Sequence, residues 1–149
     1  MKNTKFKKIL LATGILLSSG FISNAMAHSG NGPLGPDASA TDLATVECFD
    51  DGNGPGDHLV IQIEDLSPPV PGLMVNMQAF KGNVMTNITD TVSMDGNPSA
   101  IGTLKAGNGV YYISVNKTDA GPRTFNVTWH CETSTNVHTG SELNVLQVQ

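Results

Sequence analysis

The chain has 149 residues, of which 39% are hydrophobic and 14% charged, and its formal charge is -5. These values are typical of a single folded domain, and they exclude a disordered, a collagen-like or a multi-domain protein. The charge is unevenly spread, because four of the eight basic residues lie within the first eight positions.

The first 27 residues have the pattern of a signal peptide. A basic segment, 1–8, precedes an apolar run, 9–22, that is too short to span a bilayer comfortably. The run ends in Ala25, Met26 and Ala27, the small-x-small pattern that signal peptidase accepts. We therefore expect a mature chain that begins at His28 and lies in the periplasm or outside the cell.

The mature chain is expected to be acidic and free of membrane anchors. It retains four basic side chains against thirteen acidic ones, a formal charge of -9. That charge argues against nucleic acid and anionic membranes as partners. No cysteine for lipid attachment follows the apolar run, and no second apolar run follows that would insert into a membrane.

Residues 28–41 are rich in Gly, Pro, Ser and Ala, and they predict a flexible N-terminal arm. The folded domain is expected to span residues 42–149. After residue 42, hydrophobic side chains alternate almost everywhere with a period of two, as in half-buried strands. The expected strands are 43–49, 59–64, 73–80, 84–88, 100–104, 110–116, 125–131 and 143–148.

The two cysteines lie on inward faces of an early and a late strand. Cys48 shares a face with Val46, and Cys131 shares a face with Val127 and Trp129. They are the only cysteines of the chain, and exported proteins fold in an oxidising compartment. The pattern therefore predicts one structural disulfide between Cys48 and Cys131.

The loop 50–57 concentrates oxygen-bearing side chains. A calcium ion takes six to eight oxygen ligands, and the loop offers Asp50, Asp51, Asn53 and Asp57. However, Pro55 occupies a ligand position of the helix-loop-helix calcium pattern, and no bidentate glutamate follows at the right distance. Calcium is therefore one interpretation of this loop, and a plain turn is the one we favour.

About eight short strands separated by Gly, Pro and Asn turns, with no amphipathic helix, predict an all-β fold. The expected architecture is a single antiparallel two-sheet sandwich of jelly-roll or immunoglobulin-like type, held by one disulfide.

Four segments carry a resemblance to a known family. They are Leu-Val-Ile-Gln-Ile-Glu-Asp at 59–65, Leu-Met-Val-Asn-Met-Gln-Ala-Phe at 73–80, Gly-Asn-Gly-Val-Tyr-Tyr-Ile-Ser-Val at 107–115 and Gly-Pro-Arg-Thr-Phe-Asn-Val-Thr-Trp at 121–129. In their order and spacing the chain resembles the bacterial pre-peptidase C-terminal domain, a small sandwich found with secreted proteins. The resemblance implies a non-catalytic domain that binds or chaperones something outside the cytoplasm.

A mature chain that begins at His28 would place a free α-amine and an imidazole on one residue. These two nitrogens form a bidentate chelate suited to Cu(II), which a further histidine in a tetragonal site would complete. Lytic polysaccharide monooxygenases and periplasmic copper carriers resemble this chain in being exported β-sandwiches that start with histidine. The available partners are His58, His130 and His138, with Asp57 as a carboxylate, whereas a solvated terminus is the simpler interpretation of His28.

Catalytic patterns are otherwise missing from the sequence. It has no Gly-x-Ser-x-Gly elbow, and the disulfide accounts for Cys131, the thiol that a nucleophilic mechanism would use. We therefore expect a protein without catalytic activity, with a copper-dependent oxidase as the alternative.

Three functions follow from these observations. The first is an exported binding or structural module that makes contact through the loops 50–57 and 132–140. The second is an exported copper-binding protein that uses His28. The third is a self-assembling surface subunit, because the arm 28–41 or the strand-forming tail would pair with an edge strand of a neighbour.

Overall fold

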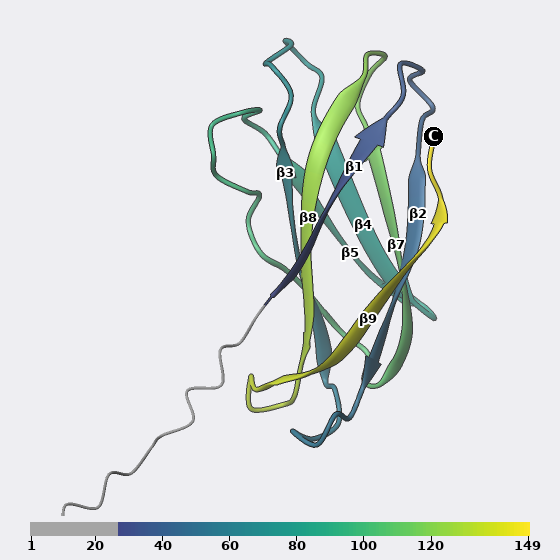
Figure 1. Cartoon of the computed structure of the whole chain (residues 1–149), viewed down its shortest axis with the longest axis vertical. Coiled ribbons are helices and arrows are strands. Elements are labelled where there is room, and N and C mark those ends of the chain that lie inside the picture. The colour runs from purple at the N-terminus through teal and green to yellow at the C-terminus, as the bar shows by residue number, and fades with distance from the viewer. Residues whose placement is uncertain (1–26) are drawn as a thin grey trace, which may run out of the picture.

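The computed structural model describes residues 27–149, so the predicted signal peptide lies outside the described residues except for Ala27 (Figure 1). The described chain forms strands joined by turns and loops, and no helix in it is long and apolar enough to cross a membrane. The strands are β1 His28–Leu34, β2 Asp42–Phe49, β3 His58–Asp65, β4 Val75–Lys81, β5 Val84–Asp90, β6 Gly102–Lys105, β7 Gly109–Lys117, β8 Arg123–Glu132 and β9 His138–Gln147.

The nine strands form one antiparallel sheet that closes almost completely into a barrel. Its order is β5-β4-β7-β2-β9-β8-β3-β6, and β1 pairs with β8 beside this path. The two end strands, β5 and β6, contact each other. The all-β prediction is confirmed, but two separate sheets are not, because β9 pairs with β8 at its start and with β2 from Gly140 onward.

The core follows the period-two pattern of the sequence. In β2, β3, β4, β7 and β8, side chains at alternate positions point inward and most of them are almost fully buried, which removes apolar area from water. The largest fully buried apolar side chains are Tyr111, Leu34, Leu59, Ile61, Ile63, Met77, Val46 and Val75.

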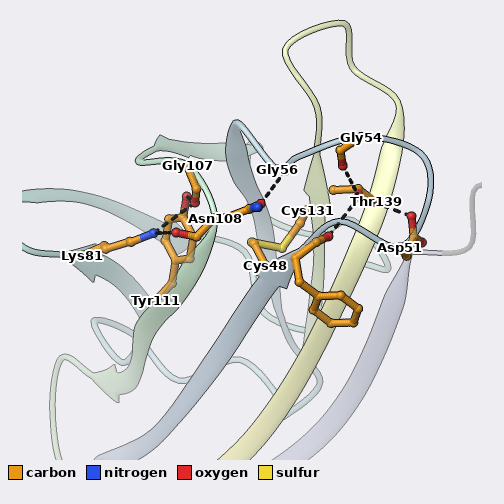
Figure 2. Close-up of a disulfide and its surroundings, with 11 residues drawn as sticks. Cys48, Asp51, Gly54, Gly56, Lys81, Gly107, Asn108, Tyr111, Cys131 and Thr139 are labelled. Carbon is orange, nitrogen blue, oxygen red and sulfur yellow. Dashed lines mark hydrogen bonds between the residues drawn. A yellow bond between two sulfur atoms is a disulfide. The ribbon is translucent and has the colours of Figure 1, made fainter.

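The predicted disulfide between Cys48 and Cys131 is confirmed. It joins β2 to β8 across the core, with the two Cα atoms 5.6 Å apart and both side chains at most 1% exposed (Figure 2). Beside it, the Thr139 hydroxyl donates to the carbonyl of Gly54 at 2.7 Å. This end of the barrel is therefore held by a covalent bond and by hydrogen bonds from the loop 50–57.

Residues 28–34 differ from the predicted flexible arm, because they form strand β1 along β8. The inward positions of β1 include Gly30 and Gly32, which lie directly over the rings of Trp129 and Phe125. Leu34, the last residue of β1, is 1% exposed. Glycine is required at position 32, because a Cβ there would lie 2.5 Å from the Phe125 ring, so the composition that suggested flexibility instead allows close packing.

Strand β9 also differs from its predicted bounds, since it begins five residues before the expected start at residue 143. The added residues include His138 and Thr139, which pair with Glu132 and Cys131 of β8. A tight turn at 134–136 therefore joins β8 and β9 into a short hairpin before β9 crosses to β2.

Candidate functional site

Strands β1 and β9 pair with successive segments of β8. We call the point where β9 passes from β8 to β2 the fork. β8 pairs with β9 through Cys131 and Glu132, and with β1 from Trp129 back to Arg123. Both partners are antiparallel to β8, so β1 and β9 run in the same direction, as their arrows in Figure 1 show. Within residues 27–149, β1 pairs only with β8, and β9 beyond Thr139 pairs only with β2. Each strand therefore presents one edge that lacks a strand partner.

The space beside these edges is an apolar slot of about 180 Å³. Its deeper residues Ile113, Phe125 and Val127 belong to the core and are each less than 8% exposed. On β9, Val145 lines the slot although 58% of its surface is exposed. The slot is lined by Gly30, Asn31, Gly32 and Pro33 of β1, Asp42, Leu43 and Ala44 of β2, Ile113 and Val115 of β7, Phe125, Val127 and Trp129 of β8, and Leu143, Val145, Gln147 and Val148 from β9 onward.

Hydrogen bonds fix the end of the slot opposite the fork. The backbone N–H of Gly35 donates to the carbonyl of Gln149 at 2.7 Å. The N–H of Gln149 donates to Asp42 Oδ1 at 2.9 Å, and the side chain of Gln147 donates to the carbonyl of Thr41 at 2.8 Å. β1 and β9 are thus held at both ends, and the slot between them is preformed.

This arrangement matches the requirements for strand addition. An extended peptide running opposite to β1 and β9 would be antiparallel to both, and would supply the backbone donors and acceptors that their free edges lack. Alternate side chains of such a peptide would point into the apolar slot, and the others would face solvent. The slot is therefore a candidate peptide-binding site.

The four predicted histidines gather at the fork end of β8, although the sequence spreads them over 110 residues. His28 stacks on Trp129 with ring centroids 5.8 Å apart, and His130 stacks on His138 at 4.4 Å. His58 lies opposite Glu132 in the β3–β8 ladder. The antiparallel register produces this convergence, because β1, β3 and β9 each begin with a histidine beside the end of β8, where His130 lies.

Glu132 connects two of these histidines, a role that the sequence analysis did not assign to it. Its Oε2 lies 3.0 Å from His58 Nε2, and its Oε1 lies 3.0 Å from His130 Nε2. The other ring nitrogen of His58 lies 2.9 Å from Asp57 Oδ2. The i, i+2 spacing of His130 and Glu132 on a strand is the signal that would have placed these side chains on one face.

The two ring nitrogens of His130 are in different environments. Because ionised Glu132 can only accept hydrogen bonds, His130 Nε2 carries the proton of this contact. In the neutral form of the ring, His130 Nδ1 would be the nitrogen with the lone pair. It is buried and has no hydrogen-bond partner within the described part of the chain.

At the fork end, the pKa values of one histidine and one carboxyl are both lowered. Burial lowers the pKa of His138 below its usual value, and the nearby charges of His130 and His28 lower it further, while Glu132 opposes the shift. The hydrogen bond from His58 holds the pKa of the Asp57 carboxyl below its usual value. The fork end therefore combines a neutral imidazole at His138 with an ionised carboxylate at Asp57.

Three carboxylates of the acidic loop 50–57 each use one oxygen for contacts within the protein. Asp50 Oδ1 accepts from the N–H groups of Gly52 and Gly54 at 2.8 and 3.0 Å, and Asp51 Oδ1 accepts from the N–H of Asn53 at 3.2 Å. Asp57 bonds His58. These contacts are those of a tight loop and give the calcium interpretation no added support. Across residues 27–149, no three or more His, Cys, Asp or Glu side chains are already placed to hold a metal ion.

Comparisons of the chain with protein-family models, with curated proteins and with solved structures find no match. The resemblance to the pre-peptidase C-terminal domain therefore stays a prediction. The apolar slot and the histidines at the fork are the two candidate sites of the molecule.

Proposed function

We propose that the protein is an exported, non-catalytic binding module that captures an extended peptide segment of another protein as an added strand between β1 and β9. The slot carries this proposal. Two unpaired strand edges that run in one direction lie on either side of an apolar floor formed by core residues. The hydrogen bonds at the Gly35 end support tight binding, because a preformed site loses little entropy when its ligand binds.

The net charge of the mature chain favours one kind of peptide segment as the ligand. The mature chain would carry a formal charge of -9, so a basic segment is attracted over long range and a second copy of the chain is repelled. β1 has seven residues, which span about 23 Å when extended. The segment is therefore expected to have seven to nine residues, with apolar side chains at alternate positions and basic side chains between them.

The test uses Trp129, the only tryptophan of the chain and a residue of the slot. The probe is a nine-residue peptide that alternates lysine with valine. Added to the chain starting at His28, it should change the tryptophan emission in a saturable manner. The same peptide with alternate amides N-methylated keeps its charge and apolar side chains but cannot pair along one edge, so it should bind at least about tenfold more weakly.

A matched pair of variants on β9 localises the binding. Val145 lines the slot, whereas the neighbouring Leu146, which is similarly exposed, does not. Val145→Gln should weaken the peptide and Leu146→Gln should leave its affinity unchanged. Equal binding of the N-methylated peptide would contradict strand addition and would indicate a site for small apolar ligands. Concentration-dependent dimerisation that Val145→Gln abolishes would show that a second copy occupies the slot, against the charge argument.

A further inference from the structure

We propose that the carboxylate of Asp42 binds the ammonium group of a lysine in the captured segment, at the end of the slot opposite the fork. The inference rests on the proposed capture of a peptide between β1 and β9. It adds that one inward-facing position of this peptide carries a cation, and it makes Asp42 a specificity-determining residue of the slot.

Asp42 is the one charged side chain among the residues that line the slot. It is the first residue of β2, and the alternation of side chains places it on the inward face of the strand, with Ala44 and Val46. Only 9% of Asp42 is exposed. The apolar slot therefore has a nearly buried anionic group at one end.

The carboxylate of Asp42 has fewer hydrogen bonds than it can accept. Its Oδ1 accepts from the N–H of Gln149 at 2.9 Å, and its Oδ2 accepts from no group within residues 27–149. An ionised carboxylate can accept several hydrogen bonds, and burying it with a single donor is costly. A cationic donor that enters the slot would offset part of this cost.

The described part of the chain provides no cation for Asp42. No nitrogen of Lys, Arg or His in residues 27–149 lies within 4.0 Å of its carboxylate. Lys117, which is buried near the same end of the barrel, donates instead to the carbonyls of Gly35 and Gly121. Burial without a cation accords with the raised pKa of the Asp42 carboxyl. Groups that lower stability in this way are expected at functional sites.

The direction of the strands determines which part of the peptide meets Asp42. β1 runs from His28 near the fork to Leu34, which precedes Gly35 (Figure 1). A peptide antiparallel to β1 therefore begins at the Gly35 end, and its first inward-facing side chain lies beside Asp42. A lysine at this position would pack its apolar stem along the slot and direct its ammonium group to the carboxylate.

The free oxygen of Asp42 favours lysine over arginine. Arginine pairs best with a carboxylate through two parallel hydrogen bonds, which engage both oxygens. In Asp42, the N–H of Gln149 already occupies Oδ1. Lysine is a compact charge with three donors and can bind through Oδ2 alone.

The experiment compares two nine-residue peptides with the same composition. The first is Lys-Lys-Lys-Val-Lys-Val-Lys-Val-Lys, and the second has the reverse order, so the extra lysine lies near the N-terminus of the first and near the C-terminus of the second. Both are acetylated and amidated, which removes the terminal charges. Titrated against the chain starting at His28 and followed by the emission of Trp129, the first peptide should bind about tenfold more tightly.

A matched pair of variants on β2 assigns the preference to Asp42. Asp42→Asn keeps an oxygen for the Gln149 N–H but removes the charge. It should lower the affinity of the first peptide to that of the second and leave the second unchanged. Glu47→Gln, at an exposed outward position of β2, removes the same charge and should keep the tenfold preference. Circular dichroism checks that both variants are folded.

The outcomes separate this inference from the proposed function. Equal affinity for the two peptides, with both weakened by Val145→Gln, would overturn the role of Asp42 and leave peptide capture intact. Tighter binding of the second peptide would contradict the antiparallel orientation. If a free N-terminus on the second peptide raised its affinity to that of the first, the α-amine and not lysine would be the cation. Saturable binding of neither peptide would overturn peptide capture and this inference together.

Discussion

Arg123 and Asp65 are buried charges that depend on each other. Asp65 is fully buried, and its Oδ2 lies 3.7 Å from Arg123 Nη1, which donates to the carbonyl of Pro68 at 2.6 Å. Asp65 also accepts hydrogen bonds from the N–H of Ser67 and the hydroxyl of Ser93. The pair joins the end of β3 to the start of β8, next to the end of the slot opposite the fork.

Arg123→Met should lower the free energy of unfolding by about 3–5 kcal/mol, because it leaves the Asp65 carboxylate buried without its cation. Urea unfolding followed by circular dichroism measures the change. The double variant Arg123→Met, Asp65→Asn should recover part of the loss. If the single variant is as stable as the parent, the buried pair does not support the fold in the way we describe.

The ionised carboxylate of Asp42 lowers the stability of the folded chain at neutral pH. It lies at the edge of the slot, and burial raises the pKa of its carboxyl, although the hydrogen bond from the Gln149 N–H opposes the shift. A raised pKa in the folded state favours folding only while the carboxyl is protonated. This contribution is present below the unfolded value of about 3.9 and is lost as the pH rises through the folded pKa.

Asp42→Asn should therefore be more stable than the parent at pH 7, with a difference that shrinks as the pH falls below about 4. The asparagine side chain keeps an oxygen that accepts from Gln149. Urea unfolding at pH 3 and pH 7 for both proteins measures the difference. A difference that grows toward low pH would have the wrong sign for a desolvated carboxylate.

At the scale of elements, the packing of β1 on β8 depends on the absence of a side chain at Gly32. A Cβ at position 32 would lie 2.5 Å from Phe125 Cζ, and one at position 30 would lie 3.5 Å from the Trp129 ring. Pro33, which has no N–H, fits an edge strand with one unpaired side. These features keep β1 on β8 and leave its other edge free.

Gly32→Ala should loosen β1 by about 1–3 kcal/mol, the usual cost of overpacking a filled site. Amide hydrogen exchange should become faster in β1 and remain unchanged in β4. Ser29→Ala, at an exposed position of the same strand, is the control. Faster exchange in both variants would show that β1 is weakly held whatever its packing.

The disulfide is a covalent link between β2 and β8. It closes a loop with a sequence separation of 83 residues, for which chain entropy predicts about 4.5 kcal/mol of stabilisation. The double variant Cys48→Ser, Cys131→Ser should lose stability of this order in urea unfolding. A loss below about 1 kcal/mol would mean that the reduced chain is already constrained.

Particular residues show how far the sequence predicts these elements. The faces on which Cys48 and Cys131 lie could be predicted, because side chains alternate between the two faces of a strand. Strand β1 could not, because a composition rich in glycine indicates flexibility unless the opposing aromatic rings are known. The role of Glu132 could not be predicted either. The strand register brings its two histidine partners to it, and the sequence alone does not give that register.

At the scale of the whole molecule, the fork determines the function that we propose. β9 crosses from β8 to β2 at Gly140, where the ring of Phe49 occupies the space of a side chain. A crossing of this kind depends on the register between distant strands, so the sequence predicted two separate sheets rather than one continuous sheet with a slot. The slot results from this crossing.

Hydrogen exchange with the lysine–valine peptide bound tests the central claim most directly. A strand inserted into the slot forms backbone hydrogen bonds with both edges, so exchange should slow in β1 and in the second half of β9 together. Strands β4 and β5, on the other side of the barrel, should be unchanged. Protection of only one of the two edge strands, or of neither while Trp129 reports binding, would contradict capture of a peptide between β1 and β9.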